Sequence, residues 1–205
     1  MNFDRLRFVA ERAEFGERRE AIFAVKIPEE RGSLRKFCEC IGKRNLTEFN
    51  YRIANEKEAH IFVGVQIQNV SEVPALIKTL EAHDIAAIEL TDDEMAKLHV
   101  RHMVGGHAPA SWGRSAGQSG NELLYRFEFP ERPGALLNFL VQLGGRFNIS
   151  MFHYRNHGSA FGRVLVGLQA SKKDAREMKK FLDNLGYRYT DETNNEAYRF
   201  FLGNQ

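Results

Sequence analysis

Some segments of this chain have hydrophobic residues at every second position, as in strands, and others have them three and four positions apart, as in helices. The same order of segments occurs twice. Apolar runs and alternations predict four strands in each half, and apolar positions three and four apart predict two helices in each half. The first half is expected to contain strands at 21–27, 46–53, 59–66 and 85–90, with helices over 32–42 and after an N-cap at Ser71. The second is expected to contain strands at 123–129, 148–155, 161–169 and 187–189, with helices from Pro133 and over 174–185. The order βαββαβ predicts an α+β fold of two ferredoxin-like units, each an antiparallel sheet with two helices on one face.

The turn after the first strand of each half has nearly the same sequence. Residues 28–34 read PEERGSL and residues 130–136 read PERPGAL, at an offset of 102. Pro133 is expected at the first helical position, where its missing N–H costs nothing. Gly32 and Gly134 leave the first helical N–H groups uncovered, and Ser33 and Ala135 follow them, so each turn is a candidate anion site. A turn repeated at a domain-sized interval indicates two modules with equivalent pockets.

The pattern divides the chain into four parts. We expect a linking amphipathic helix at 1–20, a first module at 21–104, a linker rich in Gly and Ser at 105–121, and a second module at 122–205. Each module is expected to end in a short tail that includes helix.

Composition narrows the class of protein. The 205 residues are 43% hydrophobic and 27% charged with a net charge of +2, which is ordinary for a globular protein and indicates no strongly charged partner. The only two cysteines, Cys38 and Cys40, do not make a disulfide framework, and neither a membrane-spanning run nor a signal peptide is evident. A cytoplasmic location is therefore expected, with no membrane or nucleic-acid partner. The three histidines at 99, 102 and 107 lack the further ligands of a metal site, and no catalytic constellation is evident.

Candidate binding residues come from the second strand of each half. Strand alternation predicts that a hydroxyl, an aromatic ring and a phenol share one face, and these are Thr47, Phe49 and Tyr51 in the first half and Ser150, Phe152 and Tyr154 in the second. The next strand supplies a glycine, Gly64 or Gly167, which is typical of close approach by a ligand. The two phenylalanines are equally well explained as core, whereas a buried phenol needs a polar partner. The turn suits a carboxylate, the apolar side chains suit a small aliphatic group, and the phenol suits an ammonium. Together these features fit a free amino acid.

Several segments resemble the C-terminal regulatory region of biosynthetic threonine deaminase (threonine ammonia-lyase). They are FPERPGAL at 129–136, FHYR at 152–155, EFNYR at 48–52, DDEMAKLHVR at 92–101 and DETNN at 191–195. The resemblance implies two ACT-like subdomains that bind isoleucine as an inhibitor and valine as its opponent. It also implies effector contacts by Tyr51 and Tyr154, with Arg52, Arg101 and Arg155 beside them.

The same resemblance implies a partner and an assembly. The family carries these subdomains after a catalytic domain that holds pyridoxal phosphate, and forms a cytoplasmic homotetramer. No cofactor lysine or phosphate loop is evident here, so we expect this chain to be a regulatory part without dehydratase activity or a cofactor of its own.

Two alternatives remain open on the sequence. The modules could serve only for dimerisation or assembly, since sheet edges pair readily between copies. An RNA-binding pair shares the βαββαβ order, but it needs exposed aromatic residues on its third strand. That strand offers one, Phe161, at its edge.

Overall fold

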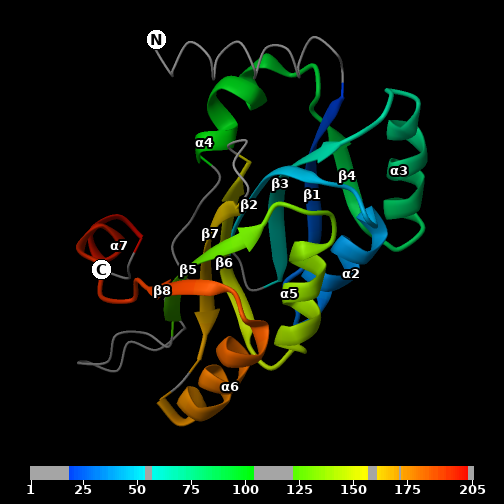
Figure 1. The fold of residues 1–205 in the computed structure, drawn as a ribbon. Coiled ribbons are helices and arrows are strands. Elements are labelled where there is room, and N and C mark those ends of the chain that lie inside the picture. Colours follow the sequence, from blue (N-terminus) through cyan, green and yellow to red (C-terminus); the bar gives the residue numbers. More distant parts are fainter. Residues whose placement is uncertain (1–18, 54–56, 104–121, 157–160, 171, 203–205) are drawn as a thin grey trace.

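The computed structural model describes residues 19–53, 57–103, 122–156, 161–170 and 172–202. The predicted helix at 1–20 and the predicted linker at 105–121 lie outside these ranges, except for Arg19 and Glu20. Glu20 already belongs to the first strand. The predicted βαββαβ order is confirmed in both halves (Figure 1).

Each half contributes the same set of elements followed by a helical tail. The first half contains β1 (Glu20–Pro28), α2 (Ser33–Ile41), β2 (Leu46–Arg52), β3 (Glu58–Gln66), α3 (Glu72–Glu81), β4 (Ala86–Glu89), and the tail segments η1 (Ala96–Val100) and α4 (Arg101–Met103). The second half contains β5 (Glu122–Pro130), α5 (Ala135–Leu143), β6 (Asn148–Arg155), β7 (Phe161–Gln169), η2 (Lys172–Asp174), α6 (Ala175–Leu185), β8 (Arg188–Asp191) and the tail helix α7 (Glu196–Phe201).

Within the described ranges, the strands of both halves join into one eight-stranded sheet. Its order is β4-β1-β3-β2-β6-β7-β5-β8, and each neighbouring pair is antiparallel. The two modules meet where β2 pairs with β6, from Glu48 opposite Arg155 to Arg52 opposite Met151. Each of these strands would otherwise be an open edge of a four-stranded sheet, so the pairing satisfies backbone groups in both modules.

One face of the sheet carries the hydrophobic core and the helices α2, α3, α5 and α6 (Figure 1). The apolar faces of these helices bury residues such as Phe37 in α2 and Phe139 in α5. At the centre, the rings of Phe49 and Phe152 meet edge to face, with centroids 5.4 Å apart across the β2–β6 pair. The cores of the two modules are therefore continuous.

A β-bulge near the start of β2 and another near the start of β6 change which side chains share a face. The register shifts between Leu46 and Glu48, and again between Ile149 and Met151. The hydroxyls of Thr47 and Ser150 consequently point to the face opposite the core, where they donate to Glu20 and Glu122. The predicted row of hydroxyl, ring and phenol on one face is therefore wrong.

The two glycines of the neighbouring strands also belong to that opposite face. A Cβ at Gly64 would collide with the Thr47 hydroxyl and come within 2.7 Å of Glu20 Oε1. A Cβ at Gly167 would lie 2.6 Å from Ser150 Oγ and 2.8 Å from a Glu122 oxygen. These glycines make room for buried polar side chains, which gives them a packing role within the chain itself.

A buried polar network ties the modules and their tails together on this second face. Arg52 on β2 forms an ion pair with Glu122 on β5, and both side chains are less than 10% exposed. Ser150 and Tyr198 also donate to Glu122, and Arg52 Nη2 donates to the Leu202 carbonyl at 3.1 Å. Burial alone would raise the pKa of Glu122, but the hydrogen bonds and charge of Arg52 outweigh it and hold that pKa below its ordinary value of 4.5.

The first tail is held in the same way. Arg101 forms a buried ion pair with Glu48 on β2, and Asn50 donates to the Arg101 carbonyl at 3.3 Å. Ala96 of η1 packs against Ile22 and Phe62, a small apolar cluster on this face. Both tails therefore cover the sheet face opposite the helices.

Two predicted helix starts differ from the structure. Helix α5 begins at Ala135 with Gly134 as its N-cap, so Pro133 lies in the preceding turn and not at the first helical position. The left-handed backbone required at Gly134 separates the proline from the helix. Ser71 precedes α3 but makes no side-chain cap, because its hydroxyl and its N–H both donate to Asn69.

Replacing Phe152 with alanine tests the continuity of the core. Phe152 is 1% exposed and contacts rings of both modules, so Phe152→Ala is expected to lower the free energy of unfolding by about 3–5 kcal/mol. Urea unfolding followed by circular dichroism measures this. The matched change Phe161→Ala removes a ring that is 56% exposed and should lower it by less than about 1 kcal/mol. Equal losses would contradict a shared core.

Replacing Arg52 with methionine tests the buried ion pair. Arg52→Met leaves Glu122 buried without its cation and should lower the free energy of unfolding by about 3–5 kcal/mol at pH 7. A carboxylate with a lowered folded-state pKa contributes its stability above the unfolded pKa and loses it as pH falls. The difference between wild type and Arg52→Met should therefore shrink below about pH 4.5.

Urea unfolding at pH 7 and pH 4 measures this, with Arg126→Met as the control. Arg126 pairs with Glu192 but is 45% exposed, so its loss should change stability by less than about 1 kcal/mol. A deficit in Arg52→Met that stays constant with pH would show that lost packing, and not the ion pair, causes it.

Candidate functional site

The two repeated turns adopt the same backbone conformation. Gly32 has φ +95° and Gly134 has φ +82°, both in the left-handed region that favours glycine. A Cβ would meet no atom within 4 Å at either position, so the backbone angle and not crowding requires glycine there. Neither helix has a side-chain cap at its N-terminus. The Ser33 and Ala135 N–H groups donate to the Glu30 and Arg132 carbonyls, so it is the next N–H groups in the first turns of α2 and α5 that can bind an anion.

Each turn borders a cavity whose remaining wall comes from the other module. The Glu131 pocket, of about 60 Å³, is formed by residues of the second-module turn and by Tyr154. Its first-module wall consists of Cys38, Ile41, Gly42, Arg44, Asn45 and Leu46.

The Glu29 pocket, of about 50 Å³, is formed by residues of the first-module turn and by Tyr51. Its second-module wall consists of Leu140, Leu143, Gly145, Phe147, Asn148 and Ile149. The two pockets are thus related by the repeat, and both lie between the modules.

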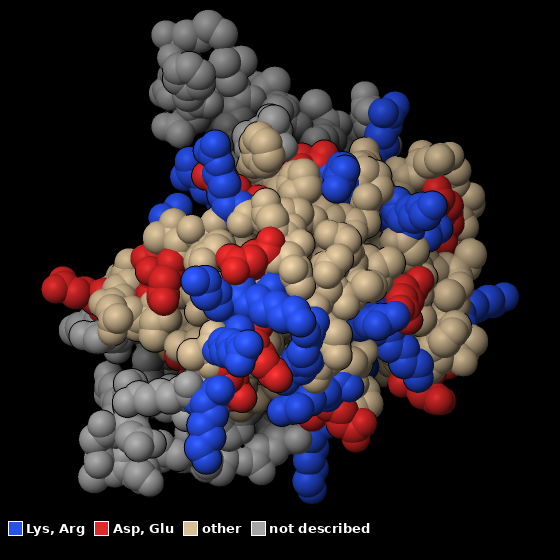
Figure 2. All heavy atoms as spheres, turned by 60° about the horizontal axis from the view of Figure 1, so that its bottom comes forward, with Lys and Arg blue, Asp and Glu red and all other residues tan. Residues whose placement is uncertain are grey.

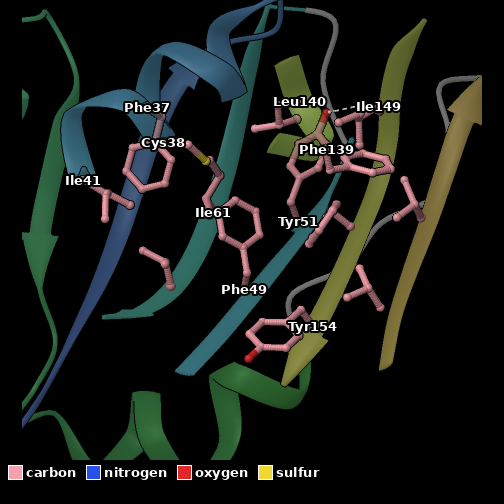
Figure 3. Close-up of a cluster of buried hydrophobic side chains, with 14 of the residues drawn as sticks. Phe37, Cys38, Ile41, Phe49, Tyr51, Ile61, Phe139, Leu140, Ile149 and Tyr154 are labelled. Carbon is pink, nitrogen blue, oxygen red and sulfur yellow. Dashed lines mark hydrogen bonds between the residues drawn. The ribbon is translucent and has the colours of Figure 1, made fainter. Parts of the chain in front are cut away.

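A buried phenol bonds to the turn glutamate in each pocket. The Tyr154 hydroxyl lies 3.0 and 2.8 Å from the two carboxylate oxygens of Glu131. The Tyr51 hydroxyl lies 2.6 Å from Glu29 Oε2 and also 3.2 Å from the Ile149 carbonyl oxygen. Figure 3 shows the two tyrosines on neighbouring strands with their hydroxyls at opposite ends of the core.

Electrostatics keep both phenols protonated. Burial and the nearby glutamate raise the pKa values of Tyr51 and Tyr154 well above the ordinary value. Burial also raises the pKa of Glu29, although hydrogen bonds from Tyr51 and Asn148 oppose that effect. Each pocket therefore offers a hydroxyl donor and a carboxylate acceptor side by side.

The structure brings some of the predicted site residues together and separates others. Gly32, Ser33 and Tyr51 line the Glu29 pocket, whereas Gly134, Ala135, Phe152 and Tyr154 line the Glu131 pocket. Phe49 is fully buried beneath them and lines neither cavity.

The three predicted arginines do not reach the pockets. Arg52 and Arg101 are held in the buried network on the opposite face of the sheet. Arg155 lies opposite Glu48 in the β2–β6 register and is likewise absent from both pocket walls. An arginine that follows a pocket tyrosine in a strand necessarily points to the other face.

Two residues that the sequence analysis did not select are central to the site. Glu29 and Glu131 occupy matching positions in the repeated turn. This match is the feature of the sequence that could have indicated a role for them in the site. Their contact with the tyrosines depends on pairing between segments more than 20 residues apart. Among the described residues, no group of three His, Cys, Asp or Glu side chains could hold a metal ion, and no helix could span a membrane. Of the three histidines at 99, 102 and 107, His107 lies outside the described ranges.

Comparison with known proteins identifies the family. The model of the C-terminal regulatory domain of threonine dehydratase matches residues 11–100 and again residues 113–202. The two matched segments correspond to the two structural modules, apart from α4, which follows the first segment. This confirms the repeat and the prediction that these residues form a regulatory domain and not a catalytic one.

Curated relatives match along nearly the whole chain. The biosynthetic L-threonine dehydratase IlvA of Burkholderia multivorans is 54% identical, and that of Escherichia coli is 50% identical, each over 98% of this chain. The mitochondrial threonine dehydratase of Saccharomyces cerevisiae is 39% identical, also over 98% of the chain. The chain spans 38% of the length of the two bacterial relatives and 35% of the yeast one.

The solved structures that match are more distant. The regulatory subunit of aspartate kinase from Thermus thermophilus is 10% identical with a TM-score of 0.30, over 82% of this chain and 92% of that one. Aspartate kinase from Synechocystis is 11% identical with a TM-score of 0.29, over 84% and 43%. The fold assignment therefore rests on the strand order described above. Because the family model matches twice and the relatives match 98% of this chain, the chain belongs to the family of C-terminal regulatory domains of threonine dehydratase.

Proposed function

We propose that the two pockets bind free branched-chain amino acids and regulate a threonine dehydratase catalytic domain, with isoleucine as the inhibitor and valine as its opponent. One observation carries this proposal. Each repeated turn faces a cavity between the modules that combines helix N–H groups, an apolar wall and a buried tyrosine–glutamate pair.

The parts of each pocket match the parts of an amino acid. The first turn of α2 or α5 suits the ligand carboxylate, since N–H groups and the helix dipole favour an anion. In the Glu131 pocket, Ile41, Leu46 and Val164 offer an apolar wall to an aliphatic side chain. The glutamate and the phenol supply polar contacts beside it. A small amino acid with a branched apolar side chain satisfies all three regions.

The position of the pockets supports a regulatory role. Both cavities have walls from both modules, so a ligand contacts the two modules together. Such a ligand favours the relative placement that it binds best. The tails on the opposite face are bonded to β2 and β5, the same elements that reach the pockets. We infer that a shift of the modules moves the tails and biases a catalytic domain that carries pyridoxal phosphate.

The alternatives receive less support. An assembly module would need no polar pair inside an apolar pocket, whereas this chain has two. An RNA-binding sheet must expose aromatic residues, but the sheet face without the core carries the tail segments, and Phe62 there is 2% exposed. Figure 2 shows acidic side chains among the basic ones on the face it presents, which does not form a continuous basic surface.

Titration calorimetry of the chain with isoleucine, valine, leucine and threonine tests the proposal. Isoleucine and valine are expected to bind saturably, and more tightly than threonine. Tyr51→Phe and Tyr154→Phe each remove a hydroxyl that orients a pocket glutamate, so each should weaken binding at its own pocket by about 5- to 10-fold.

Tyr189→Phe is the matched control. Tyr189 is 44% exposed on β8 and lines neither pocket, so removing its hydroxyl should leave the affinity for amino acids unchanged. No heat of binding from any of the four amino acids, with a folded protein shown by circular dichroism, would refute amino-acid binding by this chain and favour the assembly reading.

A further inference from the structure

The two pockets differ in how fully their glutamate is already bonded. Glu29 accepts from Tyr51 at 2.6 Å through Oε2 and from Asn148 Nδ2 at 3.2 Å through Oε1. Both of its oxygens therefore have separate donors. Glu131 accepts only from the Tyr154 hydroxyl among the described residues, at 3.0 and 2.8 Å. The carboxylate of Glu131 thus keeps more capacity for a further donor.

The difference has an identifiable origin in the repeat. Asn148 starts β6 and reaches across the module interface to Glu29. The asparagine at the corresponding turn of the first module, Asn45, lines the Glu131 pocket but donates to Gln66 at 2.8 Å instead. The Glu131 pocket therefore has no counterpart to the amide that occupies Glu29.

A second difference lies on the strand beside each glutamate. Gly162 on β7 pairs with Phe129, and Ala59 on β3 pairs with Ile27 at the equivalent register. A Cβ at Gly162 would come within 2.5 Å of Glu131 Oε1 and 2.6 Å of a Tyr154 ring carbon. The glycine thus lets the Glu131–Tyr154 pair lie against the strand, a placement that a side chain at this position would disturb.

The charges in the Glu131 pocket complement an amino acid. Arg44 and Arg132 also line the cavity, but none of the described Lys, Arg or His side chains forms an ion pair with Glu131. A half-buried anion is best stabilised by a bonded cation. The guanidinium of Arg44 is already bonded to Glu72 and to the Ile41 carbonyl, and only its buried Nε has no hydrogen-bond partner in the described part of the chain. Glu131 is therefore free to receive an ammonium, while the first turn of α5 suits the carboxylate of the same ligand.

We propose that Glu131, oriented by Tyr154, receives the α-ammonium group of the ligand, and that the Glu131 pocket is the tighter of the two sites because Asn148 already occupies Glu29. This inference rests on the proposed function and adds a selection rule to it. A 2-oxo acid of the same carbon skeleton has a carboxylate but no ammonium. It would meet the Glu131 carboxylate without a compensating charge, so the pocket selects the amino acid over the oxo acid.

The test compares Glu131→Gln with Glu29→Gln by titration calorimetry. Isoleucine is the ligand, and 3-methyl-2-oxopentanoate is the probe that lacks the ammonium. Glu131→Gln removes the charge but keeps the shape, and should weaken the tighter site by about 10- to 100-fold, as expected for a hydrogen bond to a charged group. Glu29→Gln should change the tighter site by less than about threefold. Glu128→Gln, an exposed change on β5, is the control for the loss of one negative charge.

The outcomes separate this inference from the proposed function. Failure of the wild-type protein to bind any of the amino acids refutes the proposed function and this inference with it. If Glu131→Gln leaves the isoleucine affinity unchanged, only the inference is overturned. The same holds if Glu29→Gln weakens isoleucine binding more than Glu131→Gln does. The oxo acid arm needs no variant and so does not depend on mutant folding. Wild-type binding of the oxo acid within threefold of isoleucine also overturns it, whereas at least about tenfold weaker binding supports it.

Discussion

The antiparallel pairing of β2 with β6 is the interaction on which the rest of this structure depends. It joins two four-stranded sheets into one and brings Phe49 against Phe152, so that the two cores become continuous. It also places α2 beside α5, and the C-terminal end of each helix beside the other module's turn. Neither pocket would have its second wall without this pairing.

The same two strands have a different chemistry on each face. Tyr51 points into a pocket, and the next residue, Arg52, points into the buried network that holds Glu122 and the second tail. Buried ion pairs add little net stability compared with apolar packing, because both charges must lose their hydration. Their strict geometry can still fix one arrangement of the tails relative to the sheet. A pocket and a tail contact are thus one residue apart on the same rigid strand.

The repeat has produced two pockets with the same design but different polar details. Both use a left-handed glycine, a helix N-terminus, a phenol and a glutamate. They differ at Asn148 and at the strand position held by Gly162 or Ala59. A duplicated module can therefore retain its scaffold while single contacts across the interface set the strength of each site.

The sequence by itself determined the order of the elements, the repeat at an offset of 102 and the position of the tyrosines. These features depend on local periodicity and on turn residues, which act over a few positions. Only the tertiary structure decided which groups meet. The bulges moved Thr47 and Ser150 to the opposite face, and strand geometry placed Arg52 away from the pocket.

The tertiary structure also decided that the two glutamates belong to the site. Glu29 and Glu131 contact tyrosines that lie more than 20 residues away, and Asn148 reaches Glu29 from the other module. A single inserted residue at a bulge and the choice of partner strand leave almost no trace in a hydrophobic pattern, because both are settled by pairing between distant segments.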